Sequence, residues 1–260
     1  MRFRGPEGVR SVAVGELPVE PLDPETLELP EPYELLLPVE PPEVWCAGVT
    51  YQRSRDARIE ESSIDVYSLV YAAERPEFFL KDAACRRTVG PGRPIGVRAD
   101  SSWNVPEPEL ALVLGESGEI AGYTIGNDVS SRAIEGENPL YLPQAKLFAG
   151  ACAIGPAVLV ADGEEGPFEI RMRIIGPGGE ELFAGETSTA RMQRSFPELV
   201  SWVRRDNPVP AGSVLLTGTG LVPPDDFTLE PGQRVEIHVP GIGTLANPVR
   251  AAADLMQERS

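Results

Sequence analysis

The sequence predicts a β-rich fold of the α+β class. Its 260 residues include 27 prolines and 26 glycines, and such frequent turn residues favour many short elements over long helices. Apolar residues come in short or alternating runs, which is typical of strands. A chain of this length is near the upper limit for one large core, so we expect one main domain with a small N-terminal piece.

We place the domain boundary between residues 43 and 44. Residues 1–43 begin with an expected hairpin around Pro6–Gly8 and continue as a stretch rich in proline and glutamate. Leucines in that stretch can pack, so we expect an ordered but irregular wrap leading into the main domain. Residues 44–260 are expected to form the main domain.

The strands of the main domain are predicted from short apolar or alternating runs that end at turn residues. These runs are 44–49, 78–81, 110–114, 123–125, 152–160, 168–175, 214–220 and 235–239. Residues 51–73 are first polar and then apolar at helical spacing, and we expect a mobile lid there. Ser188 or Thr189 is expected to cap a helix that continues to about Val203.

Composition excludes several kinds of partner. The formal net charge of −17 argues against nucleic acid and anionic membranes, because both require a basic surface. No apolar run reaches the roughly 18 residues that span a bilayer, and the N-terminus lacks the apolar core of a signal peptide. The three cysteines, Cys46, Cys85 and Cys152, are far apart, so we expect buried free thiols and a cytoplasmic location.

Three carboxylates are predicted to converge. Glu107 and Glu109 begin an apolar run, and residues two apart on a strand share a face. Asp128 follows a second apolar run after a glycine-rich turn. Oxygen ligands of this kind suit a hard cation, Mg²⁺ first, with Mn²⁺ and Ca²⁺ as alternatives. The competing interpretation is an acidic hairpin exposed to solvent.

Lysine is rare in this chain. It occurs only at Lys81 and Lys146, whereas the other cationic side chains except His238 are arginine. A lysine can lose its proton when it is desolvated, which an arginine does not do. Both lysines lie near the segments already singled out, and this position favours a functional role over chance retention.

The motifs resemble those of the fumarylacetoacetate hydrolase family, from about Val44 to Val249. The matching motifs are Glu107-Pro108-Glu109, the stretch 127–132 (NDVSSR), Lys146, the turn Thr217-Gly218-Thr219 and the stretch 241–248 (GIGTLANP). The resemblance implies a mixed β-sandwich roll with a small N-terminal domain, usually assembled as a homodimer or a higher homo-oligomer. It also implies Mg²⁺ or Mn²⁺ held by residues Glu107, Glu109 and Asp128, and a substrate with a 2-oxo acid or 1,3-dicarbonyl unit.

Within that family, the missing histidine separates subgroups. The carbon–carbon hydrolases and decarboxylases generally carry a His–Glu pair on the lid, but residues 48–58 contain no histidine. His238 alternates with apolar neighbours on a predicted strand and is expected to face away from the core. Stretches 48–58, 74–77, 101–109 and 135–146 instead resemble the sugar-acid dehydratases that act on 2-keto-3-deoxy acids such as 2-keto-3-deoxy-D-arabinonate. One departure is Ala133, where most of the family has aspartate, and it puts local rigidity in doubt.

This resemblance implies dehydration through an enolate, and it suggests roles for the remaining candidates. Lys146 is either the base at C3 or a stabiliser of the enolate, and Glu74 or Glu77 handles the C4 hydroxyl unless each forms only a surface salt bridge. Lys81, Thr217, Thr219, Tyr51 and Ser54 are the expected substrate-binding residues. For the two threonines, the alternative is a plain tight turn.

Three functions therefore remain open from the sequence. The first is a Mg²⁺-dependent dehydratase, a hydro-lyase, that converts a 2-keto-3-deoxy sugar acid into a 2,5-dioxo acid. The second is an acylpyruvate-type hydrolase or an oxaloacetate decarboxylase that uses a different base. The third is a metal-binding family member without efficient catalysis. The absent lid histidine favours the first over the second.

Overall fold

The computed structural model describes the chain except for residues 24–26, 53–69, 164–165 and 258–260. It confirms the predicted fold class, because strands dominate and the described helices are short. Parallel and antiparallel pairs occur in the same sheets, as a mixed roll requires. No helix among the described residues is both long enough and apolar enough to cross a bilayer.

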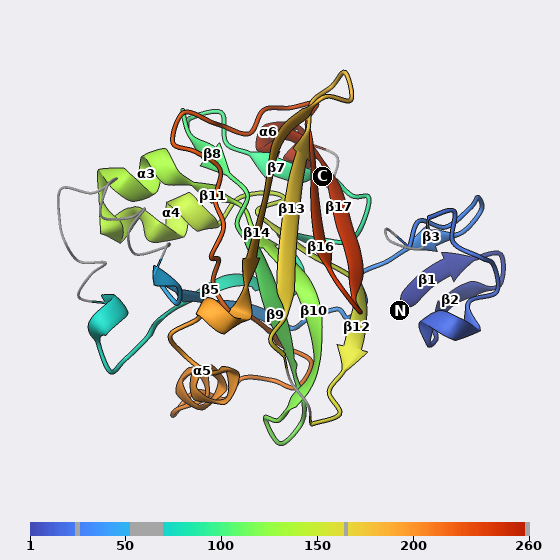
Figure 1. Ribbon diagram of the computed structural model, residues 1–260, viewed down its shortest axis with the longest axis horizontal. Coiled ribbons are helices and arrows are strands. Elements are labelled where there is room, and N and C mark those ends of the chain that lie inside the picture. The colour runs from blue at the N-terminus through green and yellow to red at the C-terminus, as the bar shows by residue number, and fades with distance from the viewer. Residues whose placement is uncertain (24–26, 53–69, 164–165, 258–260) are drawn as a thin grey trace.

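A small sheet forms near the N-terminus. Its strands, in the order β2-β1-β3, are β1 (Arg2–Gly5), β2 (Gly8–Ser11) and β3 (Glu34–Leu35), and a 3₁₀ turn, η1 (Val14–Glu16), follows β2. The pairing of β1 with β2 confirms the predicted hairpin. Figure 1 shows this sheet at one end of the molecule, apart from the larger sheets. We keep the division at residue 43 as a proposal.

Seven strands form the largest sheet. In chain order they are β4 (Glu43–Gly48), β5 (Glu77–Ala83), β6 (Thr88–Val89), β9 (Pro108–Leu114), β10 (Ile120–Asp128), β12 (Cys152–Val160) and β15 (Val214–Leu216). In space the order is β5-β4-β15-β9-β10-β12-β6. The apolar runs predicted as strands are confirmed here, with ends that differ by a few residues.

The largest sheet curls until its edges approach each other. Strands β5 and β6 lie at opposite edges of the sheet, yet only residues 84–87 connect them. Asp82 holds this connection, because its carboxylate accepts hydrogen bonds from the backbone N–H groups of Arg87 and Thr88, each at 2.8 Å. The curl brings side chains of edge strand β5 close to the end of β10.

A second sheet of five strands packs against one face of the first. Its strands are β7 (Ile95–Val97), β13 (Glu169–Ile175), β14 (Glu181–Ser188), β16 (Arg234–Val239) and β17 (Gly243–Ala251), in the order β14-β13-β16-β17-β7. Alternate residues of β13 and β16 are buried, as the alternation in their sequences predicts. His238 lies on β16 between two buried residues and points to the less buried face of the sheet. Its Nδ1 forms a hydrogen bond with Thr244 Oγ1 at 2.9 Å.

The other face of the largest sheet encloses a smaller apolar cluster. It contains Val44, Cys46, Ala111, Val113, Cys152, Ile154, Val214 and Leu216. Ala111 and Val113 share a face of β9 with Glu109, because residues two apart on a strand point the same way. The carboxylates therefore continue the row that lines the inside of the curled sheet.

The helical segments cover the sheets. They are α3 (Arg132–Glu137), η2 (Pro139–Tyr141), α4 (Leu142–Lys146), η3 (Thr189–Arg191), α5 (Phe196–Val203) and α6 (Ala252–Gln257), and a two-stranded pair joins β8 (Asn104–Val105) to β11 (Ser130–Ser131). The prediction that one helix begins at Ser188 or Thr189 was wrong about where the helix starts. Ser188 caps only the 3₁₀ turn η3, and the Ser195 side chain accepts from the Glu198 N–H to begin α5.

The cysteines are free thiols, as expected. Cys46 and Cys152 are buried, as predicted, but the prediction was wrong for Cys85, which is only half-buried. Burial raises the pKa of the Cys46 thiol well above its usual value, and nearby Asp128 and Glu109 raise it further. Burial also raises the pKa of Cys152 to about 12. Both thiols therefore stay protonated and behave as small apolar side chains.

Candidate metal centre and active site

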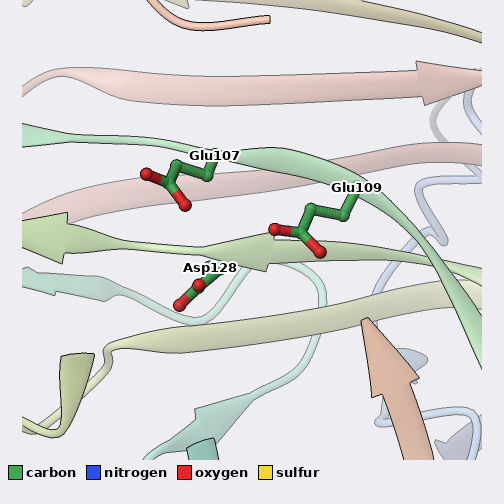
Figure 2. Close-up of side chains that lie close together, drawn as sticks. All are labelled: Glu107, Glu109 and Asp128. Carbon is green, nitrogen blue, oxygen red and sulfur yellow. The ribbon is translucent and has the colours of Figure 1, made fainter. Parts of the chain in front are cut away.

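The three predicted carboxylates do converge. Strands β9 and β10 pair so that the Asp128 N–H donates to the Glu107 carbonyl at 3.0 Å. One carboxylate oxygen from each of Glu107, Glu109 and Asp128 lies within 4.8 Å of the others. Figure 2 shows Glu109 projecting from β9, Glu107 from the chain just before that strand, and Asp128 from the neighbouring strand, with the three side chains close together. Each residue is only 2% exposed, which excludes the solvent-exposed hairpin.

Cationic side chains surround two of the three carboxylates. Lys146 Nζ donates to Glu107 Oε2 and to Asp128 Oδ2, each at 2.8 Å, and to Ser130 Oγ at 2.5 Å. Arg132 Nε donates to Glu107 Oε1 at 3.2 Å. Lys81 pairs with Asp128 Oδ1. Such pairing is needed, because an ionised carboxylate buried without a partner is strongly destabilised.

Glu109 has a different environment. Its Oε2 accepts the backbone N–H of Gly218 at 2.6 Å, and no ion pair to it occurs among the described residues. Burial raises the pKa of Glu109 well above its usual value, and repulsion from Asp128 and Glu107 raises it further. A cation at the centre of the cluster would relieve that repulsion.

Gly218 can approach Glu109 because it lacks a side chain. Its φ of +93° lies in the region that favours glycine. A Cβ at this position would stand 2.1 Å from Thr50 Oγ1. The glycine between the two predicted threonines is therefore a requirement of the loop.

The cluster fits a small hard cation. The three carboxylates line a pocket with a cavity volume of about 20 Å³, which exceeds the roughly 10–15 Å³ that one water requires. Its oxygen donors are those that Mg²⁺ prefers. The other lining residues are Ala47, Gly48, Val49, Glu77, Phe79, Glu135, Leu142, Lys146, Gly218 and Thr219.

A β-bulge brings Lys81 into the site. Val44 pairs with Asp82 and Trp45 with Leu80, so Lys81 is an extra residue in β5. Adjacent residues Lys81 and Asp82 are consequently both buried, which a regular strand would not allow. Lys81 Nζ contacts Asp128 and donates to the Val129 carbonyl at 3.0 Å. It is 0% exposed and is not among the residues that line the pocket, and its contacts are with Asp128 and Val129.

Lys146 reaches the pocket from the end of α4. Its ammonium lies 5.6 Å from the centre of the Phe79 ring, across the pocket from β5. Glu77 is two residues from Phe79 along β5 and also lines the pocket. Its carboxylate lies over Gly48, where a Cβ would stand 2.0 Å from Glu77 Oε2. Lys146 and Glu77 therefore border the space next to the carboxylates.

Of the other residues predicted for the site, only some line the pocket. Thr219 lines the pocket, whereas Thr217 Oγ1 donates to the Leu110 carbonyl at 2.8 Å and is 0% exposed. Tyr51 is buried, and burial together with Glu109 raises the pKa of its hydroxyl. Glu74 is exposed, does not line the pocket and uses its carbonyl to accept from Arg194. Ser54 and most of the expected lid lie outside the described residues.

Glu135 also lies at the site, although no motif in the sequence marks it as a candidate. This residue of α3 is 2% exposed and lines the pocket with the carboxylates. The helices α3 and α4 were also not predicted, because 132–146 is too short and too rich in polar residues for a clear apolar period. One local feature could have indicated the start of α3. Ser131 is a typical N-cap residue, and its side chain accepts a hydrogen bond from the Ile134 N–H.

The chain is similar to known proteins of one family. The family described as "Fumarylacetoacetate (FAA) hydrolase C-terminal" matches residues 43–250. A protein of Haloferax volcanii named "Probable 2-keto-3-deoxyxylonate dehydratase" is 55% identical over 215 residues, which are 82% of this chain and 74% of the relative. The "2-dehydro-3-deoxy-D-arabinonate dehydratase" of Saccharolobus solfataricus is 45% identical over 220 residues, covering 82% of this chain and 73% of that protein.

A solved structure is also similar. It is described as "2-keto-3-deoxy-D-arabinonate dehydratase complexed with magnesium and 2,5-dioxopentanoate". The sequences are 42% identical, the TM-score is 0.79, and the match covers 86% of this chain and 78% of the other. The curled mixed sheet described above is therefore shared with that structure.

Proposed function

We propose that this chain, which belongs to the fumarylacetoacetate hydrolase family, is a magnesium-dependent dehydratase of 2-keto-3-deoxy sugar acids. The observation that carries the proposal is the buried cluster of Glu107, Glu109 and Asp128 with Lys146 against it. The named activities of two relatives and the magnesium in a similar structure support the reaction and the metal.

The relatives' names narrow the substrate. One name refers to a 2-keto-3-deoxyxylonate and the other to a 2-dehydro-3-deoxy-D-arabinonate. In the D series, xylonate and arabinonate differ only at C2 and C3. A ketone at C2 and a CH₂ at C3 remove both differences, so the two names then describe one compound. We propose this D-series five-carbon acid as the substrate, and 2,5-dioxopentanoate as the product.

The residues that would hold the metal are Glu107, Glu109 and Asp128. When bound, Mg²⁺ supplies a Lewis acid that favours loss of a proton next to the 2-oxo group. Lys81 and Arg132 fix two of these carboxylates, because each contacts one of them from the side away from the pocket lining. The chain itself thus orients the carboxylates before substrate arrives.

Lys146 is the group we assign to the C3 proton. Its ammonium nitrogen lies beside the carboxylate cluster and lines the pocket, whereas the nitrogen of Lys81 lies behind Asp128. Taking the proton requires the neutral form of the amine. Lys146 then takes the proton from C3 and can return it in a later step.

Glu77 and Thr219 also line the pocket. We assign Glu77 to the departing C4 hydroxyl, because its carboxyl lines the pocket and Glu74 does not. Thr219 and the neighbouring Gly218 lie at the Glu109 end, where we place the substrate carboxylate. Thr217 keeps the loop in place through Leu110 and takes no direct part.

A three-substrate assay tests the proposed function. Purified protein with Mg²⁺ is mixed with 2-keto-3-deoxy-D-arabinonate, an acylpyruvate or oxaloacetate, and the products are followed by NMR. We expect 2,5-dioxopentanoate from the first substrate and little turnover of the others. Cleavage of the acylpyruvate or loss of CO₂ from oxaloacetate at a higher kcat/KM would replace the proposal with a hydrolase or a decarboxylase.

Assembly and location are further proposals. We propose a homodimer, as the family resemblance implies, and light scattering of the purified protein would measure its mass directly. We propose a cytoplasmic location, which the free thiols of Cys46, Cys85 and Cys152 support, because free thiols persist in reducing compartments. Fractionation of cells that express the full chain would test the location.

A further inference from the structure

Glu135 occupies a position that the assignments above leave unused. It is 2% exposed, and both oxygens of its carboxyl group are buried. Its side chain lines the same pocket as the metal-binding candidates, Lys146 and Glu77. Helix α3 presents it there because Ser131 caps the first turn and fixes where the helix begins.

The helix also fixes which end of the pocket Glu135 borders. Residues three apart share a face of a helix, and Arg132, three residues before Glu135, contacts Glu107. Gly218 contacts Glu109 instead, at the other end of the row of carboxylates. Since we place the substrate carboxylate at the Gly218 end, the hydroxyl-bearing end of the substrate extends toward Glu135.

The reaction needs a third acid–base group. Loss of the C3 proton and the C4 hydroxyl gives a 2-oxo-3-enoate that still carries its hydroxyl at C5. A 2,5-dioxo acid forms only when a C5 proton is removed, the double bond moves to C4 and C5, and C3 regains a proton. Lys146 serves C3 and Glu77 serves the C4 hydroxyl, so neither assignment covers the proton at C5.

We propose that Glu135 is a catalytic residue that removes the C5 proton. This inference rests on the proposed function. The C5–H electron pair becomes the C4=C5 bond, the former C3=C4 pair moves to C3, and C3 takes a proton from Lys146. The resulting enol gains a proton at C4 and loses one from its C5 hydroxyl to give the aldehyde. One water leaves overall, and no oxidant is needed.

Other groups near the carboxylate cluster fit this task less well. Lys81 lies behind Asp128 and outside the pocket lining, and the Thr219 hydroxyl is a poor base. Glu77 comes from β5, whereas Glu135 comes from the helical cap that also carries Lys146. Two carboxyls on different elements can serve two positions of the substrate.

The test uses Glu135→Gln, which keeps the shape of the side chain, with Glu137→Gln as the matched control. Glu137 lies on the same helix but is exposed and does not line the pocket. With 2-keto-3-deoxy-D-arabinonate and Mg²⁺, three readouts are followed. They are deuterium exchange at C3, ultraviolet absorbance of the conjugated 2-oxo-3-enoate, and formation of 2,5-dioxopentanoate.

We expect Glu135→Gln to reduce aldehyde formation by about 10²–10⁴-fold, the usual contribution of a general base. Exchange at C3 should stay within about threefold of the wild type, and the conjugated enoate should accumulate. A substrate deuterated at C5 should slow aldehyde formation in the wild type without slowing C3 exchange. Glu137→Gln should match the wild type in all readouts.

Two results would overturn the role of Glu135. One is aldehyde formation at the wild-type rate in Glu135→Gln, and the other is a parallel loss of C3 exchange and aldehyde, which would indicate an earlier or structural role. The products formed by the wild type show whether only the role of Glu135 is wrong or the proposed function is wrong as well. A wild type that forms neither the enoate nor the aldehyde would contradict both.

Discussion

The two faces of β9 contrast sharply within one strand. Leu110, Leu112 and Leu114 point into the core between the two large sheets. Glu109 points to the opposite face, inside the curled sheet, and Glu107 lies two residues before it. All five residues are at most 2% exposed, so burial is the same and only the chemistry differs.

The leucines on one face of β9 stabilise the fold, whereas the carboxylates on its opposite side prepare the protein for function. Burial of each leucine contributes about 1.5–3 kcal/mol to stability. Burial of a carboxylate costs several kcal/mol before its partners compensate, and here three carboxylates share one space. Three buried carboxylates at positions on neighbouring segments that could hold apolar residues indicate a function that needs the charge, and we propose that this function is binding of a cation.

The largest expected effect is on turnover. Lys146→Met should reduce kcat and kcat/KM together by about 10²–10⁴-fold, because it removes the group assigned to the C3 proton. Solvent deuterium exchange at C3, followed by NMR, measures that step directly. Exchange at the wild-type rate in this variant would transfer the role to Glu77.

The apolar face should respond in stability alone. Leu112→Ala should lower the free energy of unfolding by about 2–5 kcal/mol, because the side chain is 0% exposed in the main core. Denaturant unfolding measures the change. The affinity for Mg²⁺, measured by calorimetry on the folded variant, should stay unchanged. A large fall in affinity would show that the two faces are not independent.

Lys81 should affect the metal rather than the proton transfer. Lys81→Met should weaken Mg²⁺ binding by about 10–100-fold, because it removes the contact that orients Asp128 from behind. At saturating Mg²⁺ and substrate, exchange at C3 should remain measurable. If the variant instead binds Mg²⁺ normally and only its KM for the substrate rises, Lys81 contacts the substrate, as the sequence resemblance implied.

His238 should have the smallest effect. It lies on the less buried face of β16 and bonds to Thr244, and neither residue lines the pocket. His238→Ala should leave kcat unchanged and lower stability by about 1 kcal/mol or less, the usual contribution of one hydrogen bond. A large loss of turnover would revive a mechanism that uses histidine to activate water.

Much of the site could be predicted because it depends on local spacing. The alternation of a strand places Glu107 and Glu109 on one face, and strand β10 ends at Asp128. Lys146 and the fold class followed from residue types and motifs. These features require only short-range regularities, which a single sequence contains.

The remaining features depend on contacts between distant segments. The bulge at Lys81 arises in the pairing of β5 with β4, and no local pattern reveals it. The Thr217 hydroxyl donates to the carbonyl of Leu110, more than a hundred positions away, and no local pattern reveals that contact. Glu135 became visible only when α3 packed beside the carboxylates. Propensity and spacing carry no information on such packing.

Glu109→Gln tests whether the charged face of β9 is held ready for a cation. A carboxyl whose pKa is raised in the folded protein binds more protons when folded, so stability falls as pH rises from its unfolded value of about 4.3. The metal-free wild type should therefore be less stable than Glu109→Gln at neutral pH, with the difference shrinking as the pH falls toward that value.

Denaturant unfolding of both proteins, with and without Mg²⁺, is the decisive measurement. At Mg²⁺ a hundredfold above its Kd, the wild type should gain about 2.7 kcal/mol in the free energy of unfolding. Glu109→Gln should gain almost nothing, although it begins as the more stable protein. If Glu109→Gln is the less stable protein without metal, or gains as much from Mg²⁺ as the wild type, the account of this face is contradicted.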